Sequence, residues 1–200
     1  MRVLVGCEFS GTVRDAFLAH GHDAWSCDLL PSESPKGPHL QCDVRDALRN
    51  NDWDLFIVHP DCTYLTNSGV RWLHTRPERW AQMRQAAAFF RDMLTTPFAP
   101  RVAAENPIMH RYAIEIIGRR QNQVIQPWQF GHLELKATCF WLRNLPKLEP
   151  TDIVGPPRTA EERRAWARVH REPPSPERWK NRARTFTGIA AAMAEQWGSL

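Results

Sequence analysis

The stretch WDLFIVHPDC, residues 53–62, joins an almost continuous apolar run to a polar corner. The run Leu55 to Val58 lacks the polar alternation of a half-exposed strand, and this is typical of a parallel strand covered on both faces. In open parallel sheets, ligands bind beyond the carboxyl ends of the strands. The stretch therefore predicts a buried strand that leads directly into a functional corner.

Strand-like and helix-like segments alternate along the rest of the chain. The predicted strands are residues 2–7, 23–30, 39–42, 53–60, 101–106, 123–128 and 136–145. The predicted helices begin near Val13 and stop at Gly21, span 78–94 and 109–119, and close the chain at 188–200, where Thr187 is the expected cap. This alternation predicts a three-layer, doubly wound α/β domain with a mostly parallel sheet. Residues 63–77 lack periodicity and are predicted to form a long mobile loop.

Length and composition favour one compact domain over residues 1–200. The chain has 200 residues, of which 42% are hydrophobic, enough for a single core. No apolar stretch approaches the roughly 20 residues that cross a bilayer, and the first residues lack a signal-length apolar segment. We therefore expect a cytoplasmic protein with no membrane partner; the oligomeric state is left open.

The five cysteines are widely spaced and form no CxxC pair. This pattern argues against a disulfide framework and against a structural zinc, so no metal is expected. Buried structural thiols are the expectation for Cys7, Cys27, Cys42 and Cys139. Cys62 differs because it lies in a turn just past its apolar run.

Positive charge is concentrated late in the chain. The formal net charge is +4, and residues 151–184 carry nine cations and five anions, which accounts for the whole excess. Such a segment suits a polyanionic partner such as nucleic acid. A solvated helix with i,i+4 ion pairs is an equally good interpretation of the charges alone.

Polar residues lie at the carboxyl ends of the predicted strands and should share one crevice. They are Phe9 to Gly11, Asp28, Asp43, Pro60 to Cys62, and Glu105 with Asn106. The Phe9-Ser10-Gly11 turn lacks the full GxGxxG pattern and the Walker lysine, so it is either a cofactor turn or a simple glycine turn. Asp28 stands where doubly wound domains place a ribose-binding carboxylate, although an N-cap or turn role is an alternative.

Cys62 and Glu105 carry the chemistry that these segments favour. A nucleophilic cysteine needs nearby cations or oriented amides to become a thiolate, and the loop with Arg71, Arg76 and Arg79 is expected to supply them. A partly desolvated Glu105 is expected to stay protonated and to donate to a ring nitrogen. Each residue also has a plain structural interpretation, as a buried thiol and a turn carboxylate.

Taken together, the order of these motifs resembles that of the C5-cytosine DNA methyltransferases, in particular small phage-encoded ones. The resemblance covers roughly residues 1–145 and the last helix, and it implies a Rossmann-like methyltransferase domain that uses S-adenosyl-L-methionine. It implies that Phe9, Ser10 and Gly11 contact the methionine end, with Pro60 in the same site. Asp28 would bind the ribose and Asp43 the adenine amino group.

The same resemblance implies the roles of the reacting residues. Cys62 would attack C6 of cytosine, while Glu105 contacts N3 and the exocyclic amine and Asn106 helps to grip the base. Covalent addition at C6 makes C5 nucleophilic toward the sulfonium donor. In duplex DNA the base must first leave the stack, and residues 63–77 are the expected inserting loop.

The chain departs from the family pattern at several positions. Val13 replaces the second glycine of the first turn, and Asp61-Cys62-Thr63 replaces Pro-Cys-Gln. The family's Gln-x-Arg-x-Arg is replaced by a segment with only Lys136, which can donate to a phosphate or a pyrimidine carbonyl without a bidentate fork. Residues 146–184 form a basic, proline-rich insert in place of a large target-recognition domain, so we expect a short or relaxed sequence preference.

Three functions remain open on this evidence. The first is transfer of a methyl or related group to C5 of cytosine in DNA. The second is C5 modification of free dCMP or another pyrimidine nucleotide by the same Cys62 and Glu105 chemistry. The third is a catalytically silent nucleic-acid-binding module in which Cys62 is only structural.

Overall fold

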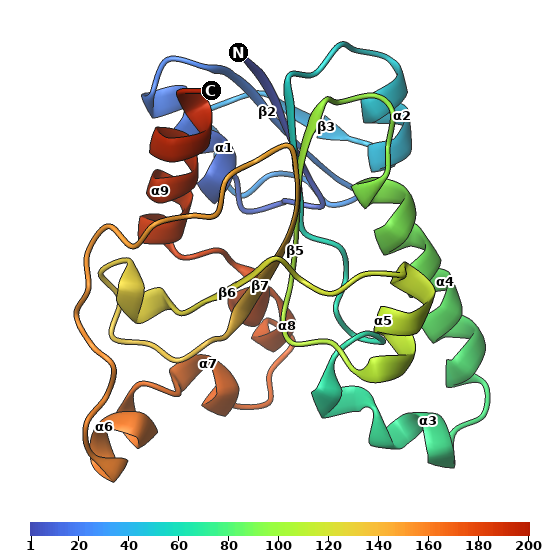
Figure 1. The fold of residues 1–200 in the computed structure, drawn as a ribbon, viewed down its shortest axis with the longest axis vertical. Helices are drawn as coiled ribbons and strands as arrows, with labels where there is room; N and C mark the ends of the chain where they lie inside the picture. The colour runs from blue at the N-terminus through green and yellow to red at the C-terminus, as the bar shows by residue number, and fades with distance from the viewer.

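The computed structural model describes all of residues 1–200 and contains one seven-stranded sheet (Figure 1). The strands are β1 Arg2–Gly6, β2 Asp23–Asp28, β3 His39–Gln41, β4 Leu55–Val58, β5 Arg101–Asn106, β6 Gln123–Ile125 and β7 Thr138–Arg143. Their order is β3-β2-β1-β4-β5-β7-β6, and only β7 runs against its neighbours. The predicted α/β fold with a mostly parallel sheet is confirmed.

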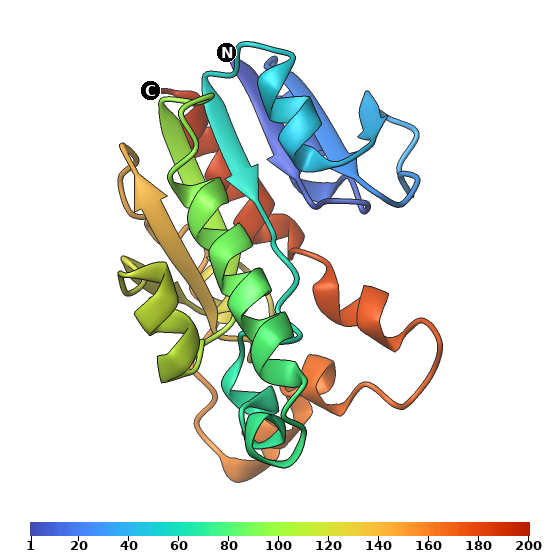
Figure 2. The same cartoon turned by 90° about the vertical axis from the view of Figure 1, so that its right-hand side faces the viewer.

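Helices cover both faces of the sheet (Figure 2). The longer ones are α1 Thr12–Ala19, α2 Val44–Arg49, α4 Arg79–Leu94, α5 Arg111–Ile117 and α9 Thr187–Gly198. One hydrophobic cluster joins one sheet face to α2, α4 and α5, and a second joins the other face to α1 and α9. None of the helices is both long and apolar enough to span a bilayer.

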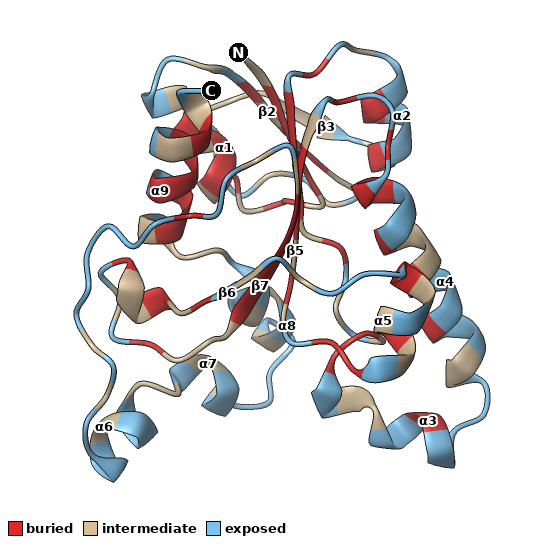
Figure 3. Ribbon diagram, viewed as in Figure 1, coloured by how far each residue is buried: buried red, intermediate tan, exposed pale blue.

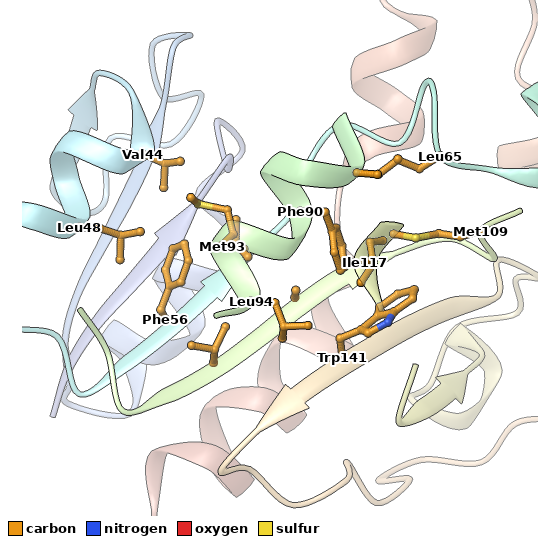
Figure 4. Packing of buried hydrophobic residues seen from close by; sticks show 14 of the residues in the cluster. Val44, Leu48, Phe56, Leu65, Phe90, Met93, Leu94, Met109, Ile117 and Trp141 are labelled. Atoms are coloured by element: carbon orange, nitrogen blue, oxygen red, sulfur yellow. The ribbon is translucent and has the colours of Figure 1, made fainter. Parts of the chain in front are cut away.

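The continuous apolar run of β4 is explained by these two layers. Side chains alternate across a strand, so Leu55 and Ile57 enter the cluster under α1 and α9, while Phe56 and Val58 enter the other. All four are fully buried. Figure 4 shows Phe56 packed beside Met93 of α4, in the cluster that α2, α4 and α5 cover.

The topology brings several segments to one end of the sheet. The parallel strands β1, β4 and β5 are adjacent, so their carboxyl ends lie side by side. Because β7 is antiparallel to β5, the amino end of β7 reaches the same end of the sheet. The segment before β7, which contains Lys136, therefore lies at the same end of the sheet as the carboxyl ends of these strands, next to that of β5.

The long loop predicted over residues 63–77 is wrong. This stretch contains the 3₁₀ turn η1 Asn67–Gly69 and the helix α3 Arg71–Thr75. Leu65 and Leu73 are buried in the core, so burial of these two side chains orders a segment without clear periodicity.

The predicted cap of the last helix is also wrong. Phe186 occupies the N-cap position of α9, and no side chain caps the helix. Thr187 is already the first helical residue, and its hydroxyl lies 3.4 Å from Nε2 of His132.

The basic segment, residues 146–184, adds little to the core. It contains the short helices α6 Ala160–Ala165, α7 Arg168–Arg171 and α8 Arg178–Ala183, whose residues are exposed or half-buried (Figure 3). The solvated helix with i,i+4 ion pairs is not found, because the one ion pair inside the segment is the i,i+3 pair of Lys180 and Glu177. Two further cations of the segment pair with acids outside it, Arg168 with Glu134 and Arg184 with Glu33.

Candidate active site

A histidine and a glutamate form the best-defined polar contact at the carboxyl end of the sheet. Val58 pairs with Ala104 in the parallel register of β4 and β5, so His59 and Glu105 follow as neighbours. Nδ1 of His59 lies 3.1 Å from Oε2 of Glu105, and the two side chains are only 10% and 16% exposed. Glu105 and Asn106 are the last residues of β5, not part of a turn beyond it.

Hydrogen bonds hold the Pro60-Asp61-Cys62 corner against this pair. The Asp61 carboxylate accepts from the backbone N–H of Thr63 at 2.9 Å and from its hydroxyl at 2.7 Å. The side-chain amide of Asn106 donates to the carbonyl of Pro60 at 2.8 Å. Asn106 is 1% exposed, so this bond fixes the corner to β5 from within the core.

The surroundings of Cys62 disfavour its thiolate. Burial raises the pKa of Cys62 to about 11, and the negative charges of Asp61 and Glu105 add to the rise. The cations that oppose this rise are Lys136 and Arg182.

The expected arginines are engaged elsewhere. Arg71 and Arg76 lie over the ring of Trp72, at 4.6 and 4.9 Å. Arg79 lies 4.6 Å from the ring of Tyr64. The prediction that these three arginines activate Cys62 is therefore wrong.

Glu105 is held as a carboxylate. Burial raises the pKa of Glu105, but the hydrogen bond from His59 and the charges of His59 and Lys136 outweigh burial and leave the pKa below its ordinary value. The expectation of a resting protonated acid is wrong because it was based on burial without the histidine beside it.

Glu8 is a second buried carboxylate of the site, and it was not predicted. Its side chain accepts from the backbone N–H groups of Val13 at 2.6 Å and Arg14 at 3.3 Å, at the start of α1. Burial raises the pKa of Glu8, and the strongest opposing influence is the charge of His59. Glu8 thus anchors the turn after β1 and faces the same histidine as Glu105.

Lys136 joins the site to the basic segment. Its ammonium donates to the backbone carbonyls of Arg182 at 2.8 Å and Arg184 at 3.3 Å. Lys136 and Glu105 line the same small hollow, whose apolar wall includes Phe186 and Ile189. The guanidinium Nε of Arg182 is buried near this site without a hydrogen-bond partner.

Two further contacts draw the basic segment toward the turn after β1. The Arg184 guanidinium binds both carboxylate oxygens of Glu33, at 2.8 and 2.9 Å. The ring of Trp179 lies 5.7 Å from the ring of Phe9, which is 7% exposed.

The residues expected to bind a cofactor fit a nucleoside in part. One oxygen of the Asp28 carboxylate accepts from the N–H of Leu30 at 2.9 Å, while the other has no hydrogen bond in the structure and suits a ribose hydroxyl. Asp43 is the N-cap of α2, and Arg45 binds both of its oxygens, which leaves it less suited to an amine. The ring of Trp179 packs at a tilt against the ring of Phe9.

The first turn has its own internal partners. Gly11 adopts a left-handed φ of 73°, and a β-carbon there would lie 2.5 Å from the Arg14 guanidinium. Ser10 donates to Glu8 at 3.4 Å and to Thr12 at 3.1 Å. These contacts shape the turn, and the binding of S-adenosylmethionine to it stays a prediction.

The structure thus brings Pro60, Cys62, Glu105, Asn106 and Lys136 together. The carboxylates of Asp28, Asp43 and Asp61 gather near Cys7, and they add to the effect of burial, which raises the pKa of that thiol to about 12.

Sequence reasoning missed Glu8 and His59. The sequence did contain a signal for both, because Glu8 directly follows the predicted strand 2–7 and His59 stands at the end of the predicted strand 53–60.

No group of His, Cys, Asp and Glu side chains is arranged to hold a metal ion.

Comparison with known proteins leaves the family open. No family model matches the chain. No curated protein matches it at a significant level either.

Proposed function

We propose that the protein transfers a methyl or related group from S-adenosyl-L-methionine to C5 of cytosine in DNA. The observation that carries the proposal is the joining of the Cys62 corner to the end of β5, where Asn106 binds Pro60 at 2.8 Å. This arrangement holds a thiol and the Glu105 carboxylate in one site. The resemblance of the motif order to the C5-cytosine methyltransferases supports the choice of reaction.

The reaction follows from the chemistry of these side chains. The Cys62 sulfur adds to C6 of the base. Glu105 contacts N3, where charge develops during the addition. When bound, S-adenosylmethionine supplies an electrophilic carbon to C5. Loss of the C5 proton then expels the thiolate of Cys62 and restores the aromatic base.

A raised thiol pKa is compatible with this role. With a pKa of about 11, Cys62 is almost entirely a thiol in the free protein. A substrate phosphate or pyrimidine carbonyl near Lys136 would compete with the carbonyls of Arg182 and Arg184 for the ammonium. We therefore expect the thiolate to form during addition to the base rather than before it.

The charge of the basic segment supports DNA as the substrate. Seven of its ten cations form no ion pair within the protein, namely Lys147, Arg158, Arg163, Arg164, Arg171, Arg178 and Arg182. Unpaired arginines that neutralise phosphates release counterions and give salt-dependent affinity for nucleic acid. The aromatic and basic side chains around Trp72 of α3 suit the insertion role proposed for residues 63–77.

The direct test supplies labelled S-adenosylmethionine with duplex DNA, single-stranded DNA or dCMP. We expect label on DNA from the wild type and from Cys42→Ala, a control at a half-buried cysteine, but not from Cys62→Ala. Label on dCMP alone would instead establish the nucleotide modification, and no label on any substrate would favour the silent binding module.

The covalent step has a separate test. DNA containing 5-fluorocytosine should trap an adduct that resists denaturation with the wild type and with Cys42→Ala. An adduct that persists with Cys62→Ala would remove Cys62 from the reaction.

A further inference from the structure

His59 interacts with two buried carboxylates. Gly6 of β1 pairs with Val58 of β4, so the segment after β1 and the residue after β4 are neighbours. Nδ1 of His59 contacts Glu105 at 3.1 Å. Glu8, in the segment after β1, is 4% exposed and its charge interacts with His59.

We propose that His59 supplies the proton that Glu105 delivers to N3 of cytosine, and that it takes the proton back when the addition is reversed or completed. The inference rests on the proposed function and deepens it. His59 acts through Glu105 and is therefore a positioning and proton-supplying residue, without contact to the base.

The need for such a donor follows from the state of Glu105. As a carboxylate it accepts hydrogen bonds but has no proton to give to N3. Among the side chains of the protein, His59 is the one that forms a hydrogen bond with it. Both side chains are largely shielded from water, so the shortest path for a proton to Glu105 is the Nδ1–H of His59.

A second observation concerns the other ring nitrogen. Nε2 of His59 is buried and has no hydrogen-bond partner. The charge of Glu8 also interacts with His59. Nδ1 is therefore the one ring nitrogen that forms a hydrogen bond, and this bond leads to Glu105.

Other titratable groups also interact with Glu105. Lys136 interacts with Glu105 across the hollow that they share. Cys62 and Cys139 feel the charge of Glu105. His59 thus exchanges its proton with Oε2 of Glu105, and the other carboxylate oxygen of Glu105 remains available to N3 of the base.

The step balances without an added reactant. Cys62 gives its thiol proton to water, from which its sulfur regains one at the end of the cycle. As the sulfur bonds to C6, the C5=C6 bond becomes C4=C5, the C4=N3 bond opens, and N3 takes a proton from Glu105, which receives one from Nδ1 of His59. In the absence of a methyl donor, C5 takes a proton from water, C4=N3 forms again and the N3 proton returns to His59 through Glu105. Loss of the original hydrogen from C5 then expels the thiolate, so hydrogen at C5 exchanges with water.

This exchange provides a test without cofactor. Release of tritium from DNA labelled at C5 of cytosine is measured between pH 3.5 and pH 7 for the wild type and His59→Asn. The asparagine keeps a donor near the position of Nδ1 but has no acidic proton that it can transfer to Glu105 at these pH values. His22→Asn is the matched control, because His22 is a half-buried histidine beside the amino terminus, at the opposite end of the sheet.

The expected result is a pH-dependent ratio of the two rates. At pH 6 the wild type should be faster than His59→Asn by about 100-fold, the usual scale of proton transfer by a positioned side chain. The ratio should fall toward one only below pH 4.5, because Glu105, whose pKa lies below its ordinary value of 4.5, then begins to take its proton from solvent. His22→Asn should match the wild type throughout.

A structural role would give a different pattern. A ratio that stays constant with pH, or equal rates at pH 6, would overturn the role of His59 while leaving the proposed function in place. Absence of exchange and of methyl transfer in the wild type would overturn both.

A second measurement needs no variant. In the wild type, the nitrogen resonances of His59 and the carboxyl carbon of Glu105 should respond over the same pH interval in NMR titrations. Titration of Glu105 with no response from His59 would overturn the inference even if His59→Asn fails to fold.

Discussion

Replacement of Asp61 by asparagine should make Cys62 more reactive. After burial, Asp61 is the first charge that raises the pKa of Cys62. Asparagine removes this charge but keeps a side-chain oxygen that can accept from the backbone of Thr63, as Asp61 does at 2.9 Å. The corner should therefore keep its shape.

The size of the effect follows from Coulomb's law. Asp61 is exposed, so its interaction with the thiolate lies near the solvent limit of about 1 kcal/mol at close range. One pKa unit corresponds to about 1.4 kcal/mol, so the pKa of Cys62 should fall by about 0.7. At pH 8 a thiol with a pKa of about 11 is about one part in 1,000 thiolate. Asp61→Asn should raise that fraction about fivefold.

The assay is alkylation of Cys62 by iodoacetamide, followed by peptide mass spectrometry between pH 7 and pH 11. The wild-type rate should rise about tenfold per pH unit, and the variant should run parallel at about five times that rate until it levels off. Asp54→Asn is the matched control, because Asp54 flanks the other end of β4 and also accepts a backbone N–H, from Arg2 at 2.7 Å. A wild-type plateau below pH 9, or no gain in Asp61→Asn, would refute the electrostatic account of this thiol.

Three further predictions concern packing, the basic segment and DNA. Gly188→Ala should lower the melting temperature sharply, with a loss of about 1–3 kcal/mol, because its β-carbon would overlap a backbone carbonyl; an unchanged melting curve would contradict the packing of α9. Arg184→Ala removes a half-exposed ion pair with Glu33, so the free energy of unfolding measured by chemical denaturation should fall by at most about 1 kcal/mol. The same variant frees the segment that carries Trp179, so S-adenosylmethionine should bind more tightly in calorimetry. Weaker binding would assign Arg184 to the cofactor site instead. Arg163→Ala should reduce the slope of log affinity for duplex DNA against log salt by about 0.9, whereas Arg91→Ala on α4 should leave it unchanged, and equal slopes in all three proteins would exclude a phosphate contact by Arg163.

The fold was predictable from the sequence because hydrophobic patterning fixes it. The unbroken run Leu55 to Val58 implies two covered faces, and the structure buries all four residues between two helical layers. The strand and helix ends also followed local signals, such as Gly21, whose φ of 80° suits a helix stop. The loop prediction for residues 63–77 was wrong because this segment is ordered by the burial of Leu65 and Leu73, a tertiary effect that leaves no periodicity in the sequence.

The electrostatics of the site were less predictable. Burial of Glu105 was anticipated, but the sign of its pKa shift depends on His59, which reaches it only through the register of β4 and β5. The cations near Cys62 were misassigned for a related reason. Lys136 and Arg182 come from distant parts of the chain, whereas the nearby arginines stack on aromatic rings.

The single antiparallel strand, β7, affects where the chain can accept insertions. Because β7 ends at the far side of the sheet and α9 begins near the candidate site, the chain must travel back along the molecule between Arg143 and Thr187 (Figure 1). That return path contributes few core residues, so its length is free to vary while both of its anchor points stay fixed. A domain inserted in this segment would rejoin the chain at α9, whose first turn lines the same hollow as Glu105, so the insert would lie next to the candidate site without disturbing the sheet.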